Sequence, residues 1–147
     1  MPIPKRLRWW MAVAAVSRFP VGVAAVILDA QQNVLMFRHT YRGRYPWGLP
    51  SGWLKRHEDP AAGMVREIME ESGLTIRVTR PLLARSGSEF ERLDLIFACE
   101  LLGGQFRPSA EVVEMSWFTE GALPALMQSQ YVMMANIFEL VRSGEVS

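Results

Sequence analysis

Residues 52–74 read GWLKRHEDPAAGMVREIMEESGL, and this stretch decides what the rest of the chain is expected to build. Asp59 and Pro60 predict a helix start, because Asp accepts a hydrogen bond from a free N–H of the first turn and Pro suits the first helical position. Gly73 predicts the helix end, because glycine takes the left-handed conformation at little cost. Between them lies an apolar stripe at helical spacing, formed by Met64, Val65, Ile68 and Met69.

Three carboxylates share one face of this helix. Glu67, Glu70 and Glu71 stand at positions i, i+3 and i+4, and like charges at this spacing destabilise a helix by roughly 0.2–0.5 kcal/mol per pair. A divalent cation turns that repulsion into attraction, and hard oxygen ligands suit Mg²⁺ or Mn²⁺. The face predicts metal-assisted phosphate chemistry, and the alternative is a solvated acidic helix face.

The stretch resembles the Nudix box, in which Gly, five residues, Glu, seven residues and Arg-Glu-apolar-x-Glu-Glu-x-Gly-apolar follow one another. The order Trp-x-Leu-Pro-x-Gly over 47–52 and the Glu-to-Trp-Phe segment over 111–118 also resemble this family. The resemblance implies an α/β fold, the Nudix α/β/α sandwich with a mixed β-sheet between helices, as one Nudix hydrolase domain over 1–147. Every specified position of the box is filled, by Gly52, Glu58, Arg66, Glu67, Ile68, Glu70, Glu71, Gly73 and Leu74.

Strand patterns flank the box. The β-branched runs 21–29 and 34–38 predict two strands of a hairpin around a polar turn. The polar segments 39–45 and 103–110 predict loops. Together with the strands and the helix given next, these elements fit a mixed sheet with helices on both faces. Further strands are expected over 74–83, 93–102 and 111–119, a hydrophilic connection over 86–92, and a helix over 128–141.

Composition narrows the classes of function. The formal net charge of +1 gives no reason to expect a nucleic-acid polymer as partner. The single cysteine, Cys99, permits no internal disulfide and fits a cytoplasmic location. Because Cys99 stands in an apolar run, it is expected in the core.

The first 18 residues carry a basic start and the apolar run Trp9 to Val16. This run is far shorter than the roughly 20 residues that a membrane span requires. We therefore expect an amphipathic helix over 5–17 that packs on the domain or on a partner subunit. No membrane association is expected, and a homodimer becomes plausible.

The resemblance also implies a reaction and its metal. Nudix enzymes hydrolyse a diphosphate linkage in a nucleoside diphosphate joined to another group, such as ADP-ribose or a nucleotide sugar. The expected cofactor is Mg²⁺, with Mn²⁺ as a second option. Glu67, Glu70 and Glu71 are then the metal ligands and base candidates, and Glu58 adds a ligand or a water-mediated contact.

Three further roles follow from the resemblance. Arg66 is expected to hold the glutamates in position, since a guanidinium forks onto carboxylates. The backbone carbonyl of Ser51 is a candidate metal ligand, although many family members carry Gly at this position. Glu111, just past a predicted loop, is the loop candidate for the general base. Weaker candidates for the base are Glu89, Glu91 and Glu114.

Substrate contacts are less specific in the sequence. The arginines of the basic loop, Arg38, Arg42 and Arg44, are candidates for a phosphate or a terminal ribose, and a solvated loop is the alternative. Large aromatics at strand ends, Trp47 and Trp117, are expected in the core. Rings that would stack a nucleobase are Tyr41, Tyr45, Phe90 and Phe106.

Other functions remain open at this point. A nucleoside triphosphate pyrophosphohydrolase would use the same box with a different pocket. A non-catalytic Nudix module would bind a nucleotide without turnover, but all the box glutamates are intact. An RNA-end hydrolase gains no support from the neutral charge.

Overall fold

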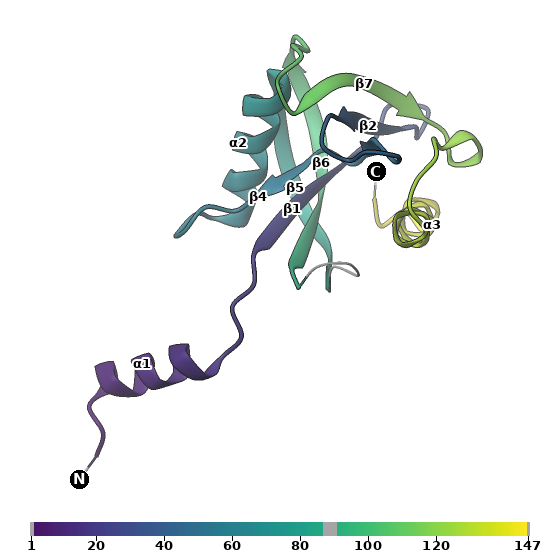
Figure 1. Cartoon of the computed structure of the whole chain (residues 1–147). Coiled ribbons are helices and arrows are strands. Elements are labelled where there is room, and N and C mark those ends of the chain that lie inside the picture. Colours follow the sequence, from purple (N-terminus) through teal and green to yellow (C-terminus); the bar gives the residue numbers. More distant parts are fainter. Residues whose placement is uncertain (1, 87–90, 147) are drawn as a thin grey trace.

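The computed structural model describes residues 2–86 and 91–146 of the chain (Figure 1). The predicted connection over 86–92 lies largely outside these residues. The elements, in order, are α1 (Lys5–Ala15), β1 (Val21–Ile27), β2 (Val34–His39), β3 (Trp47–Gly48), β4 (Ser51–Trp53), α2 (Pro60–Ser72), β5 (Leu74–Ser86), β6 (Leu93–Gly104), β7 (Val112–Phe118), the 3-10 helix η1 (Glu120–Ala122) and α3 (Gln128–Arg142).

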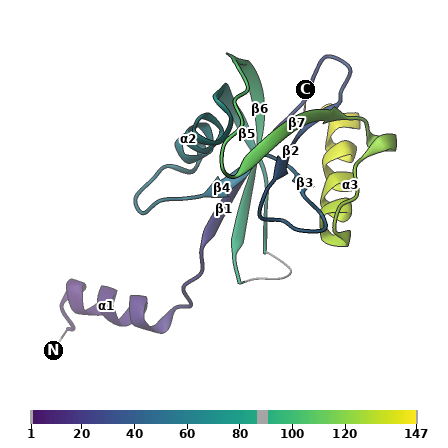
Figure 2. The same ribbon diagram turned by 45° about the horizontal axis from the view of Figure 1, so that its top comes forward.

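The strands form two sheets between two helices. The first sheet is mixed and has the order β4-β1-β6-β5, with β1 and β6 parallel and the other pairs antiparallel. The second is antiparallel, with the order β3-β2-β7. Helix α2 lies on one side of the strands and α3 on the other (Figures 1 and 2).

Alternating residues of the central strands feed two separate cores. Along β1, Val23, Ala25 and Ile27 pack with α2, whereas Val26 packs with α3. This period of two is the geometry of a strand buried on both faces. The predicted α/β/α arrangement is therefore confirmed, and Cys99 lies in the core on the α2 side.

The box helix begins and ends where the sequence predicts. The Asp59 carboxylate accepts a hydrogen bond from the Ala62 N–H at 3.0 Å, and Pro60 is the first helical residue. Gly73 ends the helix in the left-handed region, with φ of 73°. The two capping residues thus set the bounds of the helix that carries the glutamates.

The predicted hairpin of the first two strands is wrong. A tight turn does form, because the Asp29 carboxylate accepts hydrogen bonds from the backbone of Gln31 and Asn33. However, a single bridge, Leu28 to Val34, joins the two strands. Each strand lies in a different sheet, because β1 pairs with β4 and β6 while β2 pairs with β3 and β7.

Helix α1 does not pack on the domain, which corrects one half of the expectation for the N-terminal segment. Each residue of α1 is described and none is buried; Trp9 and Trp10 are 66% and 67% exposed. The helix projects away from the sheets (Figure 2). The apolar faces of the sheets are already covered by α2 and α3, so packing on a partner subunit stays a prediction. Across residues 2–86 and 91–146, no helix is both long and apolar enough to span a bilayer.

The capping contact of α2 makes a first prediction. Asp59→Ala removes the acceptor for the Ala62 N–H and should lower the free energy of unfolding by about 0.5–2 kcal/mol. Asp59→Asn keeps an acceptor of similar strength and should remain close to wild type. Urea unfolding followed by circular dichroism measures both. Equal losses in the two variants would contradict the capping role.

Candidate active site

The guanidinium of Arg66 ties the box together. Its Nε and one terminal nitrogen donate to the two Glu58 carboxylate oxygens at 2.6 and 2.9 Å. The other terminal nitrogen donates to Glu67 at 2.8 Å and Glu70 at 3.0 Å. A further bond reaches the backbone carbonyl of Trp53 at 3.1 Å, so helix α2 is joined to strand β4. Hydrogen bonds from Arg66 lower the pKa of Glu58 to about 2.

The three glutamates of the helix face meet different surroundings. Glu70 is exposed and also lies 3.7 Å from the Lys55 ammonium. The Glu67 side chain is largely buried beneath β4 and beside Arg66. Glu71 is 6% exposed and points inward. One face of the helix therefore holds one solvated carboxylate and two shielded ones.

Glu71 faces a second carboxylate, that of Glu111. Burial, followed by hydrogen bonding and like charge from Glu111 and by the charge of Glu67, raises the pKa of Glu71 to about 8. The segment before β7 is held by Thr40, whose N–H donates to the Glu111 carbonyl at 2.9 Å. The Oε2 atom of Glu71 is buried and accepts no hydrogen bond from any described residue. Such a pair of carboxyls stores one proton or receives one cation.

The donors here fit a Mg²⁺ ion that is completed by substrate. Within the described chain, no three acidic, His or Cys side chains converge into a preformed cation site. Mg²⁺, however, is usually held by one or two carboxylates plus the phosphates of a substrate. The buried Glu71 oxygen, with Glu67 and Glu111 contributing negative charge beside it, meets that lower requirement.

Strand β4 lies between these carboxylates and a pocket on its other face. Gly52 packs against Glu67 so closely that an added Cβ would lie 2.3 Å from the Glu67 carboxyl carbon. Ser51 pairs with Ala24 of β1 in an extended strand, a conformation that any residue adopts. The serine therefore presents its backbone without needing glycine, and the ligand role of its carbonyl stays a proposal.

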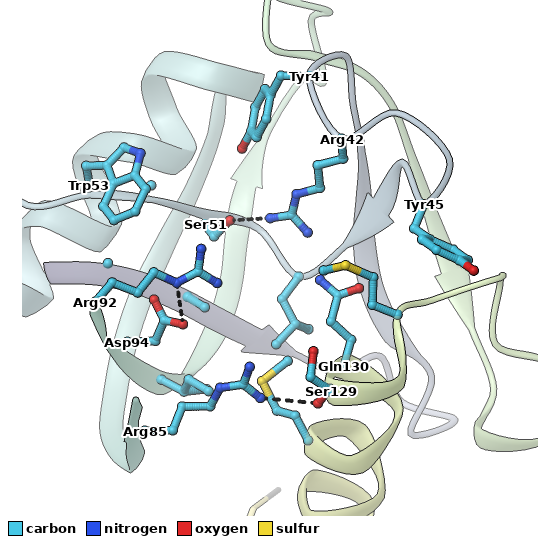
Figure 3. A pocket seen from close by; sticks show the side chains of 17 residues that line it. Tyr41, Arg42, Tyr45, Ser51, Trp53, Arg85, Arg92, Asp94, Ser129 and Gln130 are labelled. Atoms are coloured by element: carbon cyan, nitrogen blue, oxygen red, sulfur yellow. Dashed lines mark hydrogen bonds and ion pairs between the residues drawn. The ribbon is translucent and has the colours of Figure 1, made fainter. Parts of the chain in front are cut away.

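A pocket of about 340 Å³ opens on the other side of β4, beside the first turn of α3 (Figure 3). Its apolar floor includes Leu49, Ile96 and two methionines, Met127 and Met133. The size is within the range of small-molecule sites. Its rim carries the rings of Tyr41, Tyr45 and Trp53 and the charges of Arg42, Arg85, Arg92 and Asp94.

Some predicted substrate residues lie here and others do not. Tyr41, Tyr45 and Arg42 line the pocket, whereas Phe106 packs on Phe37 in the core. The exposed Arg38 is outside it. Glu89 and Phe90 lie outside the described residues. As predicted, Trp47 packs edge-on against Phe118, and Trp117 packs on the core of the α2 side.

The sequence analysis missed the wall formed by Trp53, Arg92 and Asp94. Arg92 lies 5.9 Å over the Trp53 ring and donates to Asp94 at 3.0 Å. The signal was available for Trp53 alone, because it directly follows the box glycine. Arg92 and Asp94 reach the pocket only through the parallel pairing of β6 with β1.

His39 does not reach the pocket. It is 1% exposed, and its ring lies beneath Tyr41 with 5.3 Å between the centroids. Burial lowers the pKa of His39 to about 3, so the imidazole is neutral at physiological pH. Its contribution is to support the loop that carries Tyr41 and Arg42.

Comparison with known proteins agrees with this geometry. The NUDIX domain family model matches residues 18–137. The chain therefore belongs to the Nudix family, as a pyrophosphohydrolase. It is 31% identical over 111 residues to a MutT-like protein of Streptomyces ambofaciens, covering 76% of this chain and 71% of that protein.

Solved structures share the fold. A UDP-X diphosphatase superposes with a TM-score of 0.78 at 20% identity, over 97% of this chain and 73% of that one. An ADP-ribose pyrophosphatase from Streptococcus suis 89-1591 gives a TM-score of 0.66 at 23% identity, over 79% of this chain and 89% of that one.

The raised pKa of Glu71 predicts an unusual dependence of stability on pH. Between pH 4.5 and about 8 the folded protein keeps a proton that the unfolded chain has released. Stability from this group is therefore full below pH 4.5 and is lost as pH rises through 8. The loss is on the order of a few kcal/mol, since one pKa unit corresponds to about 1.4 kcal/mol.

Glu71→Gln should remove this loss. In EDTA, thermal melts should show the variant close to wild type at pH 5 and clearly more stable at pH 9. If the Tm of wild type and the Tm of Glu71→Gln changed by the same amount from pH 5 to 9, a buried, protonated Glu71 would be ruled out.

Proposed function

We propose that this chain catalyses Mg²⁺-dependent hydrolysis of a diphosphate linkage in a nucleoside diphosphate joined to another group, with ADP-ribose or a nucleotide sugar as the substrate. The observation that carries the proposal is the buried Glu71 carboxyl, which faces Glu111 and feels the charge of Arg42 at the pocket beyond β4. A carboxyl pair in this setting binds a cation, and a cation at a pocket with several arginines suits phosphate chemistry.

The pocket favours a substrate with a group on each side of its phosphates. Trp53 with Arg92 and Asp94 forms one wall, and Tyr45 with the start of α3 forms another (Figure 3). Ser51 and Gly52 run between these walls, next to the box carboxylates. A diphosphate lying across this strand would place one organic group near each wall. The UDP-X diphosphatase that shares the fold carries a name of this substrate class.

Each box residue has a part in the proposed reaction. Glu71 and Glu67 hold the cation from the α2 side, and the Ser51 carbonyl and Glu70 are further ligand candidates. Arg66 and Glu58 keep the carboxylates in place through the ion pairs described above. When bound, Mg²⁺ neutralises phosphate oxygens and lowers the pKa of a bound water.

Glu111 is our choice for the general base. It is exposed, its carboxylate faces Glu71, and its backbone is anchored by Thr40. Glu114 lies on strand β7 opposite Arg38, so its position differs although its chemistry is the same. A carboxylate that accepts a proton from the attacking water contributes roughly 10²–10⁴-fold to a rate.

Product analysis of a nucleotide panel tests the proposal. The protein is incubated with Mg²⁺ and ADP-ribose, nucleotide sugars, CDP-alcohols, dinucleoside polyphosphates or nucleoside triphosphates, and products are separated by ion-pair chromatography. We expect ADP-ribose or a nucleotide sugar to yield a nucleoside monophosphate, and Glu71→Gln to abolish turnover. If nucleoside triphosphates were cleaved fastest, the proposed substrate class would be wrong, and the chain would be a nucleoside triphosphate pyrophosphohydrolase.

Two matched variants test the base. Glu111→Gln should lower kcat roughly 10²–10⁴-fold while the metal dependence remains. Glu114→Gln removes the same kind of charge from the neighbouring strand and should leave kcat unchanged. The assignment fails if both variants turn over like wild type, or if Glu114→Gln is the slower enzyme.

A further inference from the structure

The guanidinium of Arg42 is held at the boundary between the box and the pocket. One terminal nitrogen donates to the Ser51 hydroxyl at 2.9 Å (Figure 3). The other lies over Gly48, so that an added Cβ there would come within 2.0 Å of it. The Cζ atom of the guanidinium also lies over the Tyr41 ring, 5.9 Å from its centroid. A long side chain from an exposed loop is thus fixed by three separate contacts.

The contact with Ser51 sits where this chain departs from the family pattern. Many Nudix members carry Gly at this position, and Gly offers no hydroxyl. The side chain of Ser51 is directed across the strand to Arg42, while its backbone pairs with β1. The serine therefore adds an interaction that the common residue cannot make.

The held guanidinium still has most of its donors to offer. Arg carries five N–H groups in a planar fork, and within the described residues one hydrogen bond from Arg42 is made. The group lines the pocket and its positive charge also acts on Glu71, where it lowers the pKa against the larger effect of burial. Arg42 is half-buried, so a ligand in the pocket meets it with part of its hydration already removed.

A planar fork at this place suits one chemical class of ligand. Guanidinium binds phosphate oxygens through two parallel hydrogen bonds, and a fixed orientation reduces the entropy lost on binding. The neighbouring carboxylates would repel an anion, so a cation such as Arg42 is needed between them and the pocket. The other arginines of the rim are engaged: Arg92 with Asp94, and Arg85 with the Ser129 carbonyl at 3.3 Å.

We propose that Arg42 binds the diphosphate of the substrate and that Ser51 is a positioning residue, whose hydroxyl aims the Arg42 guanidinium into the pocket. The identity of the anion rests on the function proposed above. The predicted role of Ser51 as a carbonyl ligand is separate, because Ala keeps the carbonyl and removes only the hydroxyl.

Binding in the absence of metal tests this pair. The probe is the α,β-methylene analogue of ADP-ribose, which cannot be hydrolysed at its diphosphate, titrated calorimetrically in EDTA. Arg42→Met should weaken Kd roughly 10- to 150-fold, the range for hydrogen bonds to charged groups. Arg38→Met is the matched control, since Arg38 is exposed and lies outside the pocket, and it should bind like wild type.

Ser51 is tested by a double-mutant cycle. Ser51→Ala should weaken Kd roughly 2- to 12-fold, and should weaken it no further in the Arg42→Met background. Ser51→Thr keeps a hydroxyl on a residue that suits strands and should restore most of the affinity. With the substrate that the panel identifies, Ser51→Ala should raise KM and leave kcat nearly unchanged, since the hydroxyl acts through binding.

The outcomes separate this inference from the proposed function. If the panel shows no turnover but the analogue binds and Arg42→Met loses it, the hydrolase proposal fails and the Arg42 assignment stands. If turnover occurs but Arg42→Met binds the analogue like wild type, the Arg42 assignment fails alone. No measurable binding to wild type, or equal losses from Ser51→Ala with and without Arg42, also overturns it.

Discussion

The hydrogen bonds of Arg66 are the interaction on which the site depends. One guanidinium holds Glu58 from the loop, Glu67 and Glu70 from the helix, and the Trp53 carbonyl from strand β4. Without it, the carboxylates of the box would repel one another and the helix would lose its link to the edge of the sheet. A charged fork that meets several acceptors is strong and directional. The helix and the strand that carry the site are therefore fixed relative to each other before any ligand binds.

The sheet supplies a second constraint, because the site lies on both sides of one short strand. Strand β4 is the edge of the mixed sheet, with α2 on one side and the start of α3 on the other. Gly52 has no side chain, and this lets the Glu67 carboxyl pack directly on the strand. Ser51, one residue earlier, sends its hydroxyl to Arg42 at the pocket. A substrate phosphate over these two residues would meet the Arg42 guanidinium on one side, and on the other side carboxylates that repel it unless a cation lies between them.

Much of this architecture is predictable from local sequence signals. Asp59, Pro60 and Gly73 act within one or two turns of their own helix, so the bounds of α2 follow from residue type. Which strands pair with each other does not follow from local signals. Strands β1 and β2 have similar apolar sequences, yet they lie in different sheets. The lining of the pocket could not be predicted for the same reason, since Arg92 and Asp94 reach it through the parallel pairing of β6 with β1. The burial of Glu71 against Glu111 likewise arises from tertiary packing, which spacing along one helix does not encode.

We propose that Mg²⁺, completed by substrate phosphates, would displace the proton of the buried Glu71 carboxyl, and that this proton would pass to solvent. The most direct test is to titrate Mg²⁺ calorimetrically into the complex with the α,β-methylene analogue of ADP-ribose at pH 7, in two buffers of different ionisation enthalpy. Because the pKa of Glu71 is about 8, close to one proton should be released per ion, and the release should vanish in Glu71→Gln. Mg²⁺ binding with no proton release, or with the same release from the variant, would contradict the account.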